Sequence, residues 1–142
     1  MDDQKTGVSI IICCYNSAQR LPETLMHIAA QKIRSHFLWE VIVVDNASTD
    51  DTSKVAKESW RKFRTSAPLK VVDQPISGLI HARNRGLEEA QYEYCLFCDD
   101  DNHLQTTYIA IAYNIMSCHP EVAILGGWSK PKLPYLDRKS VV

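Results

Sequence analysis

Carboxylates gather at two places in the sequence, each directly after an apolar run. Asp99, Asp100 and Asp101 follow the run YCLFC at 94–98, and Asp45 follows WEVIVV at 39–44. Three adjacent carboxylates repel one another unless a cation offsets their charge, and Mg²⁺ or Mn²⁺ prefers such oxygen ligands. The pattern indicates a site for a divalent ion that is shared with substrate phosphates. An isolated DDD is equally typical of a solvated turn that caps the next helix.

The spacing of these carboxylates and the turn after the first apolar run refine this prediction. Asp99 and Asp101 stand two positions apart, so they point the same way if strand geometry persists through the turn. The turn CYNS at 14–17 contains no glycine, which excludes a dinucleotide fingerprint and a Walker A loop. If a nucleotide binds, a metal ion held by carboxylates is the natural substitute for a glycine-rich phosphate loop.

Strands and helices alternate in the hydrophobic pattern. Apolar runs rich in β-branched residues predict buried strands at 8–14, 39–44, 69–72, 94–98 and 122–125. Helical spacing predicts helices at 21–33, from 49 or 50 to 63, at 79–91 and at 105–118. We expect Ser17, Thr49 or Asp50, and Ser77 to cap the first three helices.

This alternation predicts an α/β fold, with right-handed crossovers, an open and mostly parallel twisted sheet, and helices on both faces. Ligands of such sheets bind outside the carboxyl ends of the strands. The turns at 15–16, 45–46 and 99–102 should therefore meet at one edge of the sheet. The acids that are remote in sequence would then share one site.

Bulk composition narrows the class of protein. The chain has 142 residues and a net charge of −1, which fits one domain and gives no basic field that would attract nucleic acid. Five cysteines lie in apolar stretches, which favours a reduced, cytosolic compartment. Cys95 and Cys98 lie three positions apart on a predicted strand and so face opposite sides. Core packing of these cysteines is therefore favoured over a zinc site. His27 is interpreted as a helix-surface or partly buried residue.

Four segments together resemble glycosyltransferase family 2, inverting enzymes with the GT-A fold. They are VSIIICCYN at 8–16, EVIVVDNASTDDT at 40–52, ISGLIHARNRGLEEA at 76–90 and LFCDDDN at 96–102. The resemblance runs from Val8 to about Pro131. The chain departs from the family pattern at Cys13, where proline or threonine is usual.

The resemblance implies roles for individual residues. Tyr15 would lie against the nucleotide base, and Asp45 would accept from the imide N–H of the base. Asp101 would contact the metal ion, with Asp99 as a second ligand or nearer the ribose or diphosphate. Asp100 is the ambiguous middle residue, assigned with the donor nucleotide. Arg83 would lie by the diphosphate or form a structural salt bridge with an acidic turn.

The resemblance also implies a reaction and its participants. The donor is a nucleoside-diphosphate sugar, with a UDP-sugar favoured, the cofactor is Mn²⁺ or Mg²⁺, and the acceptor is a hydroxyl of a glycan, a lipid or another molecule. Residues 1–129 would form the donor domain and 130–142 the start of the acceptor side. No residue matches the catalytic base, since Asp137 comes too early. We therefore expect an N-terminal piece of the enzyme that binds the donor. We expect the protein to be cytoplasmic, or peripheral at the inner membrane face. The alternatives are a non-catalytic nucleotide-binding fragment and a nucleotidyltransferase-like enzyme.

Overall fold

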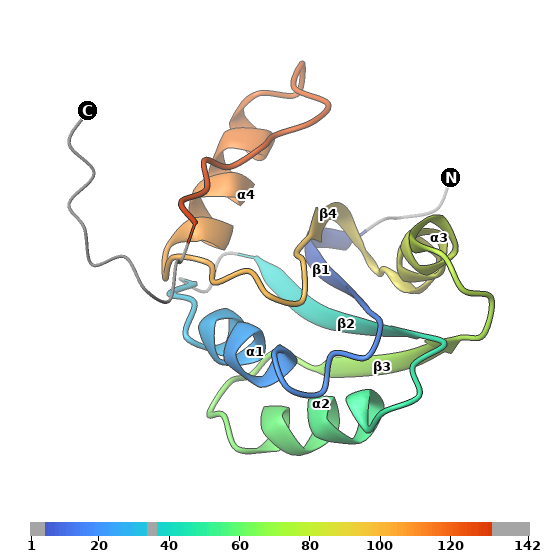
Figure 1. Ribbon diagram of the computed structural model, residues 1–142. Coiled ribbons are helices and arrows are strands. Elements are labelled where there is room, and N and C mark those ends of the chain that lie inside the picture. Colours follow the sequence, from blue (N-terminus) through green and yellow to red (C-terminus); the bar gives the residue numbers. More distant parts are fainter. Residues whose placement is uncertain (1–4, 34–36, 132–142) are drawn as a thin grey trace.

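Four strands and four helices alternate along the chain. The computed structural model describes residues 5–33 and 37–131 (Figure 1). The elements are β1 (Lys5–Cys14), α1 (Leu21–Ala29), β2 (Leu38–Asn46), α2 (Thr52–Arg61), β3 (Leu69–Gln74), α3 (Leu79–Glu89), β4 (Tyr92–Phe97) and α4 (Tyr108–Cys118). None of the helices in these two ranges is long and apolar enough to cross a membrane.

The four strands form one parallel sheet in the order β3-β2-β1-β4. Cys14 pairs with Asp45, Asp45 pairs with Asp73, and Ile11 pairs with Phe97. The carboxyl ends of all four strands therefore lie along the same edge. This confirms the predicted α/β class and parallel sheet.

Helices cover both faces of the sheet, as predicted, because side chains alternate along the two central strands. Ile10, Ile12 and Val43 belong to the core beneath α1, α2 and α4, whereas Ile11 and Val44 pack with α3 on the other face. All five side chains are fully buried, and each such burial contributes about 1.5–3 kcal/mol. Figure 1 shows α1 and α2 together on one side of the sheet and α3 apart from them.

A polar cluster lies inside the sheet near the amino ends of the strands. Glu40 of β2 is only 2% exposed. One of its carboxylate oxygens accepts hydrogen bonds from the Ser9 hydroxyl at 2.7 Å and the Gln91 backbone N–H at 2.8 Å. The other accepts from the Gln91 side chain at 3.2 Å, and the Ser9 hydroxyl accepts from the Tyr92 N–H. Three neutral donors, one from Ser9 on β1 and two from Gln91, thus satisfy this buried acid.

The predicted fifth strand at 122–125 is wrong. The Val122 N–H bonds to the His119 carbonyl in a turn, and Ile124 is 90% exposed. A strand needs a neighbour for its backbone groups, and no strand within 5–33 and 37–131 pairs with this segment. The sequence pattern alone could not reveal that missing neighbour.

Several helix boundaries also differ from the prediction, most clearly the end of α1 and the start of α4. α1 ends at Ala29, short of Ile33, because the Lys32 N–H leaves the helix to bind the Thr106 carbonyl at 2.7 Å. α4 begins at Tyr108 rather than at 105, since the Gln105 carbonyl accepts the Tyr108 N–H in the preceding turn. The first change comes from a contact between segments that are remote in sequence, and the second from a local turn.

The cysteines follow the predicted strand geometry only in part. Cys95 and Cys98 do face opposite sides, but Cys95 is exposed rather than in the core, whereas Cys98 is buried. β4 lies at an edge of the sheet, and α3 packs on β1 and β2 instead of covering it. The outward face of β4 therefore stays accessible at Cys95.

Candidate functional site

Side-chain hydrogen bonds connect the loops after β1 and β2 at the carboxyl edge of the sheet. The Asn16 side-chain oxygen accepts from the Thr49 N–H at 2.8 Å, and the Ser48 hydroxyl accepts from the Asn16 N–H at 3.0 Å. The Asp50 carboxylate accepts from the Ala18 N–H at 3.0 Å. These bonds hold the two loops in a fixed relation, so the edge of the sheet is preorganised.

Two residues of these loops adopt the left-handed backbone conformation without being glycine. Asn16 has φ of 49° and Ala47 has φ of 56°. Asparagine tolerates this region, whereas alanine is strained there. Such strain clusters at ligand sites, which makes this edge the candidate site on backbone grounds alone.

Asp45 lies half-buried at the end of β2. Its carboxylate accepts hydrogen bonds from the Ser53 hydroxyl and, at 3.3 Å, from the Ser48 N–H. It lines an open hollow of about 210 Å³ whose other walls are Ala47, Ser48, Asp73, Gln74 and Pro75. Tyr15 stands on the adjoining loop after β1, with its side chain 57% exposed. An acceptor and an exposed aromatic ring thus belong to neighbouring strand ends.

The loop that follows β3 is held to this edge by Asn46. Its side-chain oxygen accepts from the Gly78 N–H at 2.9 Å, and its amide donates to the carbonyls of Gln74 and Ile76. Gly78, with φ of 136°, precedes α3 in place of the predicted Ser77 cap. Only glycine adopts such a conformation readily, so this turn depends on Gly78 and not on a capping hydroxyl.

The middle carboxylate of the acidic turn is used inside the protein. Asp100 accepts a hydrogen bond from the Ser17 hydroxyl and forms an ion pair with Arg20 at 2.8 Å. Its backbone carbonyl accepts from the Thr24 hydroxyl at 2.8 Å. The hydrogen bond that Arg20 donates to the Asp100 carboxylate raises the pKa of the Arg20 guanidinium. Asp100 therefore anchors the turn to the start of α1.

The two flanking carboxylates are arranged differently. Asp99 and Asp101 are exposed, and neither side chain forms a hydrogen bond or ion pair with any residue in the described part of the chain. Two uncommitted carboxylates near one another fit a hard divalent cation, which takes oxygen ligands. Burial, followed by the charges of Asp99 and Asp101, raises the pKa of the nearby Cys98 thiol to about 12.

Arg83 brings a positive charge to the same edge. Its guanidinium lies 5.7 Å from the centre of the Phe97 ring, at the end of β4. Burial raises the pKa of the Cys13 thiol, Arg83 opposes the rise, and the charges of Asp99 and Asp100 add to it. Arg83 and the acidic turn therefore both lie within electrostatic reach of Cys13. The structural salt bridge considered for Arg83 does not form among the residues that the structure describes.

Sequence reasoning missed how α1 supports the segment after the acidic turn. The Gln31 amide donates to the carbonyls of His27 and Gln105, at 3.2 and 2.7 Å, and its oxygen accepts from the Ile109 N–H. Together with Thr24 and Lys32, these contacts run along α1 from end to end. Apart from the contact between Gln31 and His27, the partners stand more than 70 residues apart, so no local signal indicates them.

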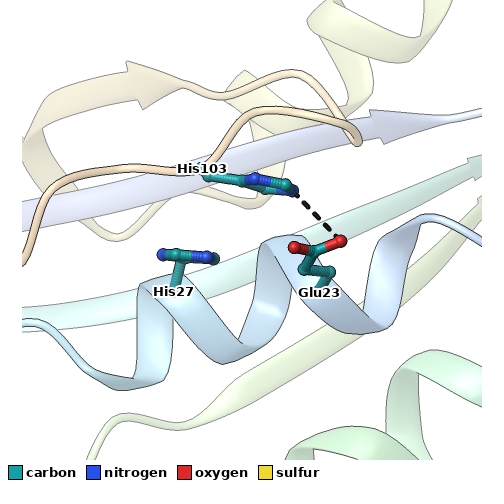
Figure 2. A group of neighbouring side chains, drawn as sticks. All are labelled: Glu23, His27 and His103. Atoms are coloured by element: carbon teal, nitrogen blue, oxygen red, sulfur yellow. Dashed lines mark ion pairs between the residues drawn. The ribbon is translucent and has the colours of Figure 1, made fainter. Parts of the chain in front are cut away.

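A second missed feature is a cluster of Glu23, His27 and His103, midway along this contact (Figure 2). Glu23 and His27 stand four positions apart on α1, which places them on one helix face. That spacing is the local signal that could have indicated half of the cluster. His103 joins them only through the tertiary fold.

Comparison with known proteins decides the family. A protein-family model for glycosyl transferase family 2 matches residues 9–139. The chain belongs to glycosyltransferase family 2. The resemblance of the four sequence segments is thereby confirmed.

Individual members of family 2 agree with this assignment. The chain is 32% identical over 110 residues to the cholesterol galactosyltransferase of Borreliella burgdorferi, which covers 78% of this chain and 29% of that protein. It is 28% identical over 99 residues to a poly-β-1,6-N-acetyl-D-glucosamine synthase of Staphylococcus epidermidis, covering 69% and 22%. The chain thus spans less than a third of the length of these relatives.

Solved family 2 structures confirm the GT-A fold. S. aureus TarS in complex with UDP matches with a TM-score of 0.69 and 29% identity, over 81% of this chain and 33% of that one. The mannosyltransferase PcManGT from Pyrobaculum calidifontis, in complex with GDP-Man and Mn²⁺, matches with a TM-score of 0.61 and 31% identity, over 70% and 28%. Both comparison structures hold a nucleotide.

Proposed function

We propose that residues 1–129 form the donor-binding domain of an inverting, metal-dependent glycosyltransferase. The donor would be a nucleoside-diphosphate sugar, with a UDP-sugar favoured, and the acceptor a hydroxyl of a glycan, a lipid or another molecule. One observation carries the proposal. The uncommitted carboxylates of Asp99 and Asp101 lie at the same sheet edge as the hollow lined by Asp45.

The base of the nucleotide would bind at the ends of β1 and β2. Tyr15 offers an exposed ring for stacking, and the Asp45 carboxylate offers an acceptor for the imide N–H of a uracil. Ser53 and Ser48 already hold that carboxylate in place. A site built to accept this hydrogen bond would disfavour bases that lack a donor there.

The diphosphate would lie toward the acidic turn. Asp101 and Asp99 would hold Mn²⁺ or Mg²⁺, an ion that when bound neutralises charge on the diphosphate leaving group. Arg83 would add positive charge from α3, and Asp100 would fix the turn through Arg20 and Ser17. The UDP of TarS and the GDP-Man and Mn²⁺ of PcManGT support, by similarity, the binding of a nucleotide and a divalent ion, without bearing on which residues hold them.

The residues of this chain would bind and orient the donor rather than activate the acceptor. We assign no catalytic base to any of them. A single in-line displacement at the anomeric carbon would account for inversion, and orientation of the donor lowers its entropic barrier. Transfer would thus need a base beyond the residues assigned here.

Calorimetry with UDP, GDP and dTDP, each with and without Mn²⁺, tests the donor site. We expect UDP to bind only with Mn²⁺, and Asp101→Ala or Asp99→Ala to weaken binding by about tenfold or more, since a charge-assisted contact contributes about 1.5–3 kcal/mol. Glu58→Ala on the exposed face of α2 is the control and should bind like the unaltered chain.

Two outcomes would contradict the proposal. One is nucleotide binding that is indifferent to Mn²⁺, and the other is unchanged binding by Asp101→Ala. Measuring sugar transfer and donor hydrolysis separately distinguishes a working enzyme from a module that only holds nucleotide.

A further inference from the structure

Glu23, His27 and His103 gather their side chains on the face of α1 that meets the segment after the acidic turn (Figure 2). One potential ligand atom from each residue lies within 4.8 Å of the others. The two imidazole rings are stacked, with centroids 4.7 Å apart and an interplanar angle of 9°. Three groups capable of binding a metal thus face one small volume.

The contacts within this cluster are loose. His103 Nε2 lies 3.6 Å from a Glu23 carboxylate oxygen, which is too long for a good hydrogen bond. Ring stacking involves the faces of the imidazoles and leaves the nitrogens at their edges. The His27 ring nitrogens form no hydrogen bond with any residue of 5–33 and 37–131. The ring nitrogens of His27 are therefore available to bind an ion.

The chemistry of the ligands selects the ion. Two imidazoles and one carboxylate suit Zn²⁺ and other late first-row divalent ions, whereas Mg²⁺ and Mn²⁺ prefer oxygen. We propose that Glu23, His27 and His103 form a second metal site, which takes Zn²⁺ and is separate from the carboxylate pair Asp99 and Asp101. The proposal does not depend on the donor function.

The site can close with small movements. Zinc bonds of about 2.0–2.2 Å place tetrahedral ligand atoms about 3.4 Å apart. Atoms that already lie within 4.8 Å of one another would move by at most about 1.4 Å, and the two stacked rings would turn out of their parallel arrangement. Both histidines are half-buried, and Glu23 is 48% exposed. A water molecule could therefore take the fourth position from the solvent side.

A metal ion here would join two elements that already touch along their length. Thr24 bonds to the Asp100 carbonyl before the cluster, and Gln31 bonds to the Gln105 carbonyl after it. The ion would add a connection between these two points, on the segment that begins with the acidic turn. Zn²⁺ would thus stabilise the fold and restrict the motion of that turn.

Titration with Co²⁺, a spectroscopic substitute for Zn²⁺, tests the site in a background with Cys95→Ser and Cys118→Ser, which removes the exposed thiols. We expect visible absorption bands of a tetrahedral ion at one equivalent, and displacement by Zn²⁺. His27→Ala and His103→Ala should each weaken binding by at least about tenfold, since even changes to outer-shell partners cost about 10–100-fold. Zn²⁺ should also raise the thermal midpoint, because it binds only the folded state.

His119→Ala is the matched control. His119 also lies beside a glutamate, at 3.1 Å from Glu121, but it belongs to no group of three potential metal ligands among the described residues. The His119→Ala variant should keep the full Co²⁺ spectrum. The double variant that carries Asp99→Asn and Asp101→Asn should keep it as well. Circular dichroism without metal checks that each variant folds. If an alanine variant does not fold, the corresponding glutamine variant, His27→Gln or His103→Gln, takes its place. An unchanged affinity in folded variants of both histidines, or no Co²⁺ bands in the parent chain, would overturn the proposal.

Discussion

Asp100 differs in its task from the two aspartates beside it. It is tied to Ser17 and Arg20, while Asp99 and Asp101 stay uncommitted at the surface. A hydrogen-bonded carboxylate that is 13% exposed contributes to stability, whereas exposed carboxylates without partners contribute little. Stability and ligand binding are therefore assigned to different members of one acidic triplet.

Substitution separates these two tasks. Asp100→Ala should lower the free energy of unfolding by about 1–2 kcal/mol, a figure discounted because Arg20 is 48% exposed. The free energy of unfolding of Asp101→Ala should stay within about 0.5 kcal/mol of that of the parent chain. Urea denaturation measures both, and equal losses in the two variants would contradict the assignment.

Asp50 should make stability depend on pH. Hydrogen bonds from Thr52, and then from the Ala18 N–H, lower the pKa of this carboxyl. A lowered folded-state pKa gives stabilisation that is complete above the ordinary aspartate value of about 3.9 and is lost as pH falls through the folded value. The stability difference between the parent chain and Asp50→Asn should therefore be constant near neutral pH and shrink below about pH 4.

Chemical denaturation across this pH range, in both proteins, measures that difference. A difference that stays constant down to pH 2 would contradict the role given to the Asp50 carboxylate.

At this scale the sequence predicts where the carboxylates lie but not how they are used. Each acid follows an apolar run, so its position at a strand end can be deduced. The commitment of Asp100 depends on Ser17 and Arg20, some 80 residues away, and the cluster around His27 depends on His103. Such contacts arise from packing and have no local signature.

At the scale of elements, α3 approaches β1 closely at Gly86. A Cβ at this position would overlap the Cγ2 atom of Ile11, which is fully buried. Gly86→Ala should destabilise the fold, because overpacking costs about 1–3 kcal/mol and outweighs the helix-propensity gain of about 1 kcal/mol. Denaturant titration measures the loss.

A double-mutant cycle tests the cause. In an Ile11→Ala background the overlapping atom is gone, so Gly86→Ala should become neutral or stabilising by up to about 1 kcal/mol. Gly126→Ala is the control, since nothing lies within 4 Å of its Cβ position. Additive effects of the two substitutions would rule out the steric explanation.

The elements themselves were largely predictable. β1 and β2 are buried on both faces, so their continuous apolar runs are typical of parallel strands. The run at 122–125 has the same composition but no partner strand, and its prediction failed for that reason. Apolar patterning reports the tendency to be buried and does not report whether a neighbour exists.

At the scale of the whole molecule, protection against hydrogen exchange should fall from the sheet toward α4. Most residues of the central strands β1 and β2 are buried, whereas α4 buries only Ile109 completely and extends beyond the sheet in Figure 1. Amides of β1 and β2 should exchange at the rate of global unfolding, and those of α4 should exchange at least about tenfold faster. Mass spectrometry of exchanged peptides measures this, and equal protection would contradict it.

The buried Glu40 has a consequence for how substitutions in this protein should be interpreted. If β2 slipped by one residue, this acid would lose its three donors and be left without hydrogen-bond partners, which is costly for a buried polar group, so the present alignment of β2 with its neighbours is strongly favoured. That alignment also sets Asp45 beside Cys14 at the far end of the same strand. A random-mutagenesis screen scored by nucleotide retention should therefore return Glu40 among its hits, although the residue stands five positions before Asp45 on β2 and outside the proposed nucleotide site.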